Sequence, residues 1–119
     1  MKELMTKWEG TTFPEWIRGL PEIDVPFDGV RGWLLQAGAK QVVFFDIQPV
    51  GAVPAHSHGA QWGIVVEGEM ELTIGDETKI YRSGDWYYIP EGVMHSANFL
   101  TRVSVIDVFS EPDRWKAKQ

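Results

Sequence analysis

The sequence predicts an all-β fold of the jelly-roll type, preceded by a short helix and an extended arm. From residue 30 onward, short apolar or alternating runs are bounded by Gly, Pro, Asp and Ser, as strands are bounded by turns. Residues 42–45 and 64–66 are apolar at every position, which is typical of strands buried on both faces. The chain has 119 residues, a length that favours a single domain.

Residues 1–29 are predicted to form an arm outside the barrel. The helical spacing i, i+3, i+4, i+7 is met in this arm by Phe13, Trp16, Ile17 and Leu20. Thr12 and Glu15 have the spacing of a capping box at the start of that helix. An extended piece over 21–27 and a turn at Asp28-Gly29 are expected to follow.

The barrel itself is expected over residues 30–112, followed by a polar tail over 113–119. Its predicted strands are, in order, 30–35, 41–47, 63–66, 69–74, 78–81, 86–89, 96–100 and 102–109. In the strand 69–74, Glu and Thr alternate with Met, Leu and Ile, so one face of that strand is expected to meet water.

Charge and residue types exclude several classes of protein. Acidic residues number 17 and basic residues 11, a formal net charge of −6, which disfavours a nucleic-acid or membrane-surface binder. The apolar runs are too short to span a membrane, and residues 1–7 lack the apolar stretch of a signal peptide, so a cytoplasmic location is expected. Without cysteine there is no disulfide, thiolate metal site or catalytic thiol.

The three histidines of the chain are His56, His58 and His95. His56 and His58 are separated by one residue, so on a strand their side chains would point to the same face and could converge on one ion. Neutral imidazoles suit Fe, Mn, Co, Ni, Cu and Zn. The histidines therefore predict a site for one divalent transition-metal ion.

Two stretches around these histidines resemble the paired signature motifs of the cupin superfamily. The first motif, glycine, His-x-His, an acid and a later glycine, is matched by Gly51, His56, His58, Gln61 and Gly68, with glutamine in the place of the acid. The second motif is matched by Gly84, Pro90, Gly92, His95 and Asn98. The resemblance implies one cupin double-stranded β-helix in which the metal ligands are His56, His58, Gln61 and His95.

Two roles are possible for each of Gln61 and Asp107. An amide oxygen from Gln61 would leave the charge of the ion uncompensated and make it a stronger Lewis acid, whereas a Gln61 that only hydrogen-bonds in the barrel would leave three protein ligands. Asp107 shares a strand face with Phe109, and if that face lines the barrel, Asp107 is a candidate general acid or base. Otherwise it faces solvent or pairs with Arg102 or Arg31.

Residues near the end of the chain resemble one particular group within this superfamily. The segment Asp107-Val-Phe109-Ser-Glu-Pro-Asp-Arg114 is similar to that of the small uronate-converting cupins of pectin and alginate breakdown, which open the ring of an unsaturated monouronate. This resemblance implies that Asp107, Phe109 and Arg114 surround the substrate.

We therefore expect a metal-dependent isomerase or lyase of carbohydrate metabolism, acting on a small anionic sugar acid or keto acid. A metal-dependent dioxygenase and a non-enzymatic binding barrel remain alternatives, because fold alone does not choose among them. A homodimer is also expected, since barrel edges and faces are a pairing hazard unless covered. Its predicted contacts, on the barrel or on the partner, are Trp8, Phe13, Trp16 or Ile17.

Overall fold

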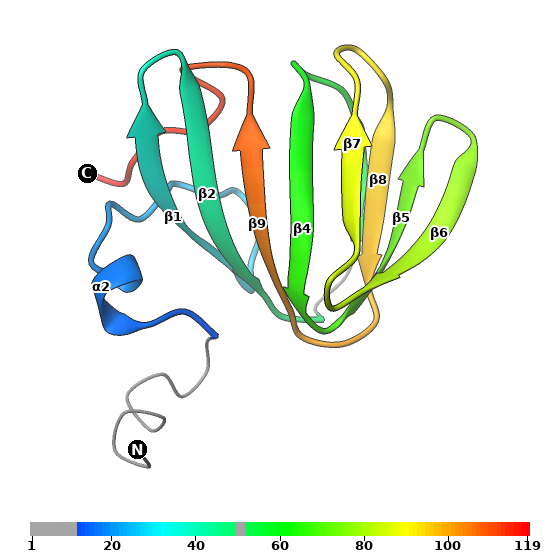
Figure 1. Cartoon of the computed structure of the whole chain (residues 1–119), viewed down its shortest axis with the longest axis horizontal. Helices are drawn as coiled ribbons and strands as arrows, with labels where there is room; N and C mark the ends of the chain where they lie inside the picture. The colour runs from blue at the N-terminus through cyan, green and yellow to red at the C-terminus, as the bar shows by residue number, and fades with distance from the viewer. Residues whose placement is uncertain (1–11, 50–51) are drawn as a thin grey trace.

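The computed structural model describes residues 12–49 and 52–119 and shows two antiparallel sheets (Figure 1). The five-stranded sheet has the order β1-β2-β9-β4-β7, and the four-stranded sheet has the order β3-β8-β5-β6. The strands are β1 (Val30–Ala37), β2 (Lys40–Ile47), β3 (Ala52–His56), β4 (Gln61–Glu67), β5 (Glu69–Ile74), β6 (Glu77–Arg82), β7 (Trp86–Ile89), β8 (His95–Phe99) and β9 (Val103–Phe109). The predicted all-β jelly-roll class is confirmed.

The predicted strands are found within a few residues of their expected bounds, with one omission. The omission is β3, because its sequence Ala-Val-Pro-Ala-His is short, contains proline and lacks an apolar alternation. Its pairing with β8 is also irregular, with a register shift between Val53 and His56. Proline and bulges occur in strands mainly at sheet edges, and β3 is an edge strand.

The predicted helix is a single turn, α2 (Glu15–Arg18), and the predicted capping box does not form. Pro14 is the N-cap and makes no side-chain cap hydrogen bond. The Thr12 hydroxyl instead lies 2.9 Å from the Ser104 hydroxyl and also bonds the Glu67 carboxylate. Thr12 therefore attaches the start of the arm to the barrel. In the described part of the chain, no helix has the length and apolarity to cross a membrane.

The arm packs on the barrel through two buried side chains. Phe13 is 3% exposed and meets the ring of Phe44 edge-on, with 5.5 Å between ring centroids. Ile23 is 1% exposed, and its backbone N–H donates to the carbonyl of Gly32 in β1. Trp16, by contrast, is 77% exposed, and Trp8 lies outside the described residues.

The outer face of the five-stranded sheet is apolar across its width. Two rows of cross-strand neighbours run over it: Trp33, Phe44, Ile106, Ile64 and Trp86, and then Leu35, Val42, Val108, Trp62 and Tyr88. Phe13 covers the end of this face at β1 and β2. Toward β7 the face lies open, because Trp86 is 63% and Tyr88 53% exposed.

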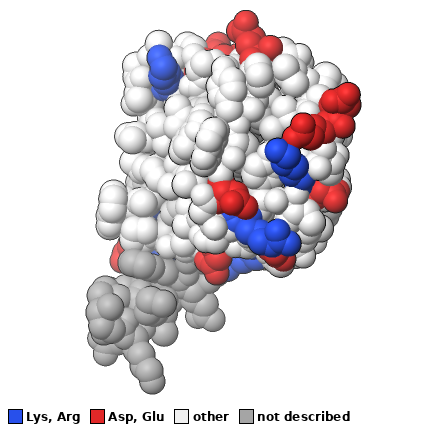
Figure 2. All heavy atoms as spheres, turned by 45° about the vertical axis from the view of Figure 1, so that its right-hand side comes forward, with Lys and Arg blue, Asp and Glu red and all other residues white. Residues whose placement is uncertain are grey.

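Exposed charged pairs lie on β5 and β6 instead. Lys79 bonds Glu77 at 2.9 Å, and Arg82 bonds Glu69 at 2.6 Å. Figure 2 shows acidic and basic side chains interspersed on this side of the molecule. Since β6 is an edge strand, these charges discourage the addition of another strand there.

Candidate functional site

A cavity of about 210 Å³ lies between the two sheets, and its walls come from both of them. All the residues that the sequence singled out for chemistry line it: His56, His58, Gln61, His95, Asp107, Phe109 and Arg114. They come from the ends of β3, β4, β8 and β9 and from the segments that follow β3 and β9. The leading glycine of the first motif, Gly51, lies outside the described residues.

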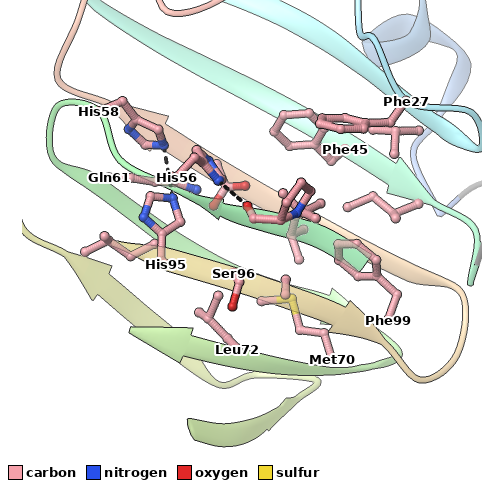
Figure 3. Close-up of a pocket in the computed structure, with 18 of the residues that line it drawn as sticks. Phe27, Phe45, His56, His58, Gln61, Met70, Leu72, His95, Ser96 and Phe99 are labelled. Carbon is pink, nitrogen blue, oxygen red and sulfur yellow. Dashed lines mark hydrogen bonds between the residues drawn. The ribbon is translucent and has the colours of Figure 1, made fainter. Parts of the chain in front are cut away.

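The three histidines meet at one end of this cavity (Figure 3). Their ligand nitrogens all lie within 4.8 Å of one another. His56 ends β3 and is the cross-strand neighbour of His95, which begins β8. His58 lies in the loop after β3 and not on a strand, so the loop brings it to the cluster and the alternation considered from the sequence does not apply.

Backbone carbonyls hold each imidazole in one orientation. The Nδ1 atoms of His56, His58 and His95 lie 2.9, 2.8 and 3.0 Å from the carbonyl oxygens of residues 54, 59 and 93. A carbonyl only accepts, so each neutral ring donates through Nδ1–H and keeps the lone pair of Nε2 free. A bond of this kind fixes the tautomer and the ring orientation of metal-binding histidines.

The free nitrogens have the spacing of ligands to one ion. The Nε2 atoms of His58 and His95 are 3.1 Å apart. Two nitrogens each about 2.1 Å from one ion, at a right angle, are separated by about 3.0 Å. Two lone pairs at this distance repel unless a proton or a cation lies between them. The donor set therefore fits a divalent transition-metal ion held by three imidazoles.

Burial keeps two of these imidazoles neutral, as metal binding requires. Desolvation lowers the pKa of His58 to about 4, helped by the positive charge of Arg114. Burial likewise lowers the pKa of His95. Both rings are therefore unprotonated near neutral pH.

The loop that carries His58 is fixed from two sides. The backbone N–H of Gly92, in the second motif, donates to the carbonyl of His58 at 2.9 Å. The backbone N–H of Gly59 donates to Oε1 of Glu111 at 2.6 Å. A Cβ on residue 59 would lie 2.6 Å from that oxygen, so a larger residue there would displace the Glu111 carboxylate. Sequence reasoning missed Glu111, because it acts on a loop 52 positions away.

Gln61 and Asp107 are joined within the cavity. Gln61, the first residue of β4, is 9% exposed and hydrogen-bonds the carboxylate of Asp107. An ionised carboxylate only accepts, so the amide nitrogen of Gln61 faces Asp107 and its Oε1 stays available. The contact within the barrel and a role as a metal ligand are therefore compatible.

Asp107 lies on the inner face of β9 and is 4% exposed. The Tyr87 hydroxyl donates to its Oδ1 at 2.6 Å. Burial raises the pKa of Asp107 to about 6, against the lowering effect of the hydrogen bonds from Tyr87 and Gln61. Neither alternative partner contacts it: Arg102 binds Asp46, with Nε 2.9 Å from Oδ1, and Arg31 binds Glu22 at 2.9 Å.

Sequence reasoning also missed Gly63, which makes room for this pair. A Cβ there would lie 2.1 Å from Oδ1 of Asp107 and 2.3 Å from the ring of Tyr87. Gly63 is the cross-strand neighbour of both residues, in the middle of β4. A glycine inside a strand signals such a close approach, and this signal was present in the sequence.

Arg114 and Trp115 bring two unpartnered donors to the cavity wall. The Arg114 guanidinium lies 4.3 Å from the centroid of the Trp115 ring. Within the described residues, Nε of Arg114 and Nε1 of Trp115 are buried without a hydrogen-bond partner. Phe109 separates this pair from the histidines, with ring centroids 5.8 Å from His58 and 6.2 Å from Trp115. Buried donors of this kind favour a ligand with acceptor oxygens.

Comparisons with known proteins agree with this architecture. The family model described as "Cupin domain" matches residues 43–109. Among curated proteins, the chain is similar to H2HPP isomerase of Bacillus subtilis, with 34% identity over 83 residues. That match covers 68% of this chain and 35% of the relative, so the chain spans about a third of the relative's length.

Solved structures of cupins are also similar to this chain. An RmlC-like cupin from Shewanella frigidimarina has 27% identity and a TM-score of 0.70, over 79% of this chain and 86% of that one. KdgF from Halomonas sp. has 25% identity and a TM-score of 0.68, over 77% and 86%. A variant of oxalate decarboxylase from Bacillus subtilis, at 20% identity and a TM-score of 0.69 over 81% of this chain and 28% of its own, shares the fold.

Proposed function

Because this chain belongs to the cupin family, we propose that it is a metal-dependent enzyme that acts on a small anionic metabolite, a sugar acid or a keto acid. The reaction class is acid–base chemistry such as isomerisation or ring opening. The observation that carries this proposal is the set of three imidazoles with free Nε2 atoms at the same cavity as a buried carboxylate of raised pKa. A relative named an isomerase, with 34% identity, supports the reaction class.

The metal would be held by Nε2 of His56, His58 and His95, with Oε1 of Gln61 as a fourth ligand. Zn, Ni, Fe, Mn, Co and Cu all accept this set of imidazole and amide donors. A bound divalent ion supplies Lewis-acid polarisation of a substrate oxygen.

The other cavity residues bind the substrate and move a proton. Arg114, with the Nε1–H of Trp115 beside it, binds the carboxylate of the substrate, which provides the acceptors that these buried donors lack. Asp107 accepts a proton from the substrate and returns it at another atom, because a pKa of about 6 is close to working pH. The Tyr87 hydroxyl orients the Asp107 carboxylate, and the ring of Phe109 excludes water.

Turnover is expected to be independent of oxygen. The cavity offers a proton-transfer group and an anion-binding group, which isomerisation or ring opening uses without an oxidant. The test incubates the metal-loaded protein with a panel of uronic and 2-oxo acids and follows product by NMR, in air and under argon. Equal rates support the proposal. Conversion only in air would identify a dioxygenase, and tight binding without any conversion would identify a binding barrel.

We also propose that the protein is a homodimer joined through the open part of its apolar sheet face. A tryptophan in the centre of an interface is commonly a hot spot, so Trp86→Glu should weaken the dimer by at least about 30-fold. The matched control is Ile80→Glu, since Ile80 is 43% exposed on the charged side of the molecule. Light scattering over a concentration series measures both, and a monomeric parent protein at high concentration would refute the dimer.

A further inference from the structure

The cavity is divided into a polar end and an apolar end. Figure 3 shows His56, His58, His95 and Gln61 gathered at one end, and Phe27, Phe45, Phe99 and Met70 toward the other. The polar end also holds the Asp107 carboxylate, which hydrogen-bonds Gln61. One cavity therefore offers two chemically different surroundings to a single ligand.

The apolar end is built from side chains of both sheets and of the arm. It includes Val25, Phe27, Ile47, Met70, Leu72 and Phe99. Among the cavity-lining residues that the structure describes, the Tyr87 hydroxyl already donates to Asp107. Ser96 lies, by strand alternation, on the same face of β8 as Asn98 and not with His95 and Ala97. The remaining donors outside the polar end are those of Arg114 and Trp115, which the proposed function gives to the carboxylate.

This lining suits an apolar tail and not a polyhydroxylated one. Each hydroxyl of a sugar acid that enters the cavity gives up its hydrogen bonds to water and needs a partner in the wall. Among its described side chains, the apolar end has no such partners for a sugar that carries several hydroxyls. An apolar group gains from the same burial.

We infer that the substrate is a 2-oxo acid or similar small carboxylic acid with an apolar tail about the size of a benzene ring, and not a sugar acid. This inference rests on the proposed function only for the acid group that binds at the polar end of the cavity. The size follows from the volume: a dry cavity of about 150 Å³ holds benzene, and this one, at about 210 Å³, leaves room for a few further heavy atoms.

The first test compares carboxylic acids that differ in the group attached to the acid, that is, in the tail. Calorimetry of the nickel-loaded protein should show phenylpyruvate binding at least tenfold more tightly than pyruvate, and galacturonate no more tightly than pyruvate, since even one methylene in an apolar pocket changes discrimination about tenfold or more. Equal affinity for phenylpyruvate and pyruvate would overturn the inference that the substrate has an apolar tail, but would leave the proposed role of the polar end unchanged. Tighter binding of galacturonate would overturn the inference in favour of a sugar acid.

A probe without a carboxylate or keto group tests this inference separately from the proposed function. Toluene added to the metal-free protein should shift the NMR resonances of Met70 and Leu72 side chains, because only the apolar end is needed. Absence of these shifts would overturn the inference. Shifts with toluene, without binding of any of the three acids to the loaded protein, would keep the apolar end and overturn the proposed function.

Two variants with opposite effects on tail size complete the test. Ala97 lines the cavity between its neighbours Val53 and Leu72, so Ala97→Leu should reduce phenylpyruvate affinity at least tenfold while pyruvate and nickel binding stay unchanged. Ala39→Leu, at an exposed position, is the matched control. Met70→Ala should shift the preference toward the larger indole-3-pyruvate, so the inference is also testable if Ala97→Leu fails to fold. Unchanged tail preference in folded variants would overturn it.

Discussion

Replacing His95 with alanine is expected to abolish stoichiometric metal binding. The chain has three histidines and no cysteine, so the loss of one imidazole cannot be made up by another imidazole or by a thiolate. The loss of an outer-shell partner typically weakens metal binding about 10–100-fold, and the loss of a ligand itself should exceed that range. Metal content by mass spectrometry and the visible spectrum of the cobalt-loaded protein measure the effect without a substrate.

Asn98→Ala is the matched control for this experiment. Asn98 is on the same strand, is exposed and donates to Glu71 on the outer side of the sheet, so its loss should leave the metal content unchanged. His58→Ala should behave as His95→Ala does. A His95→Ala protein that keeps one tightly bound ion per chain would show that the histidine cluster is not the metal centre.

The second large effect is expected on catalysis, from Asp107→Asn. General acid–base catalysis is typically worth about 10²–10⁴ in rate, and asparagine cannot accept the proton that the carboxylate accepts. Asparagine has the same shape, and its carbonyl oxygen can still accept from the Tyr87 hydroxyl, so folding should survive. The three imidazoles remain to hold the ion even if the Gln61 amide turns, so the metal content should survive as well. Initial rates of the loaded protein on the substrate identified by the panel of acids give the measure.

Asp113→Asn controls for the change of charge near the site, because Asp113 is exposed and does not line the cavity. Its rate should equal that of the parent. If Asp107→Asn also turns over at the parental rate, Asp107 has no part in the mechanism, and the raised pKa reflects burial alone.

Most of the fold could be predicted because its strands carry their own patterns. The strand predicted at 69–74 alternates polar and apolar residues, and β5 has the same bounds. The predicted strand at 86–89 likewise matches β7. β3 has no such pattern, and its irregular pairing with β8 decides its shape. The capping box failed for a similar reason: Ser104 and Glu67 of the barrel compete for the Thr12 hydroxyl.

The site could be predicted where its residues are close in sequence or belong to a motif. His56, His58 and His95 meet these conditions, and the structure brings them together. Tyr87 and Trp115 do not, because their roles depend on cross-strand register and on how the chain turns back after β9. The apolar lining of the cavity could not be predicted from the sequence either. An inward-facing apolar residue gives the same sequence pattern whether its side chain fills the core or lines a cavity.

The central place of β9 in the five-stranded sheet has a consequence for folding kinetics. β9 pairs with both β2 and β4, and Arg102, directly before β9, binds Asp46 of β2, 56 positions away in the chain. Such non-local pairing slows folding, because the loop entropy is lost before the contacts form. Until β9 is in place, β2 and β4 have open edges, and the cavity lacks Asp107 and Phe109. Strand insertion should therefore be the slow step, and the same step completes both the sheet and the site.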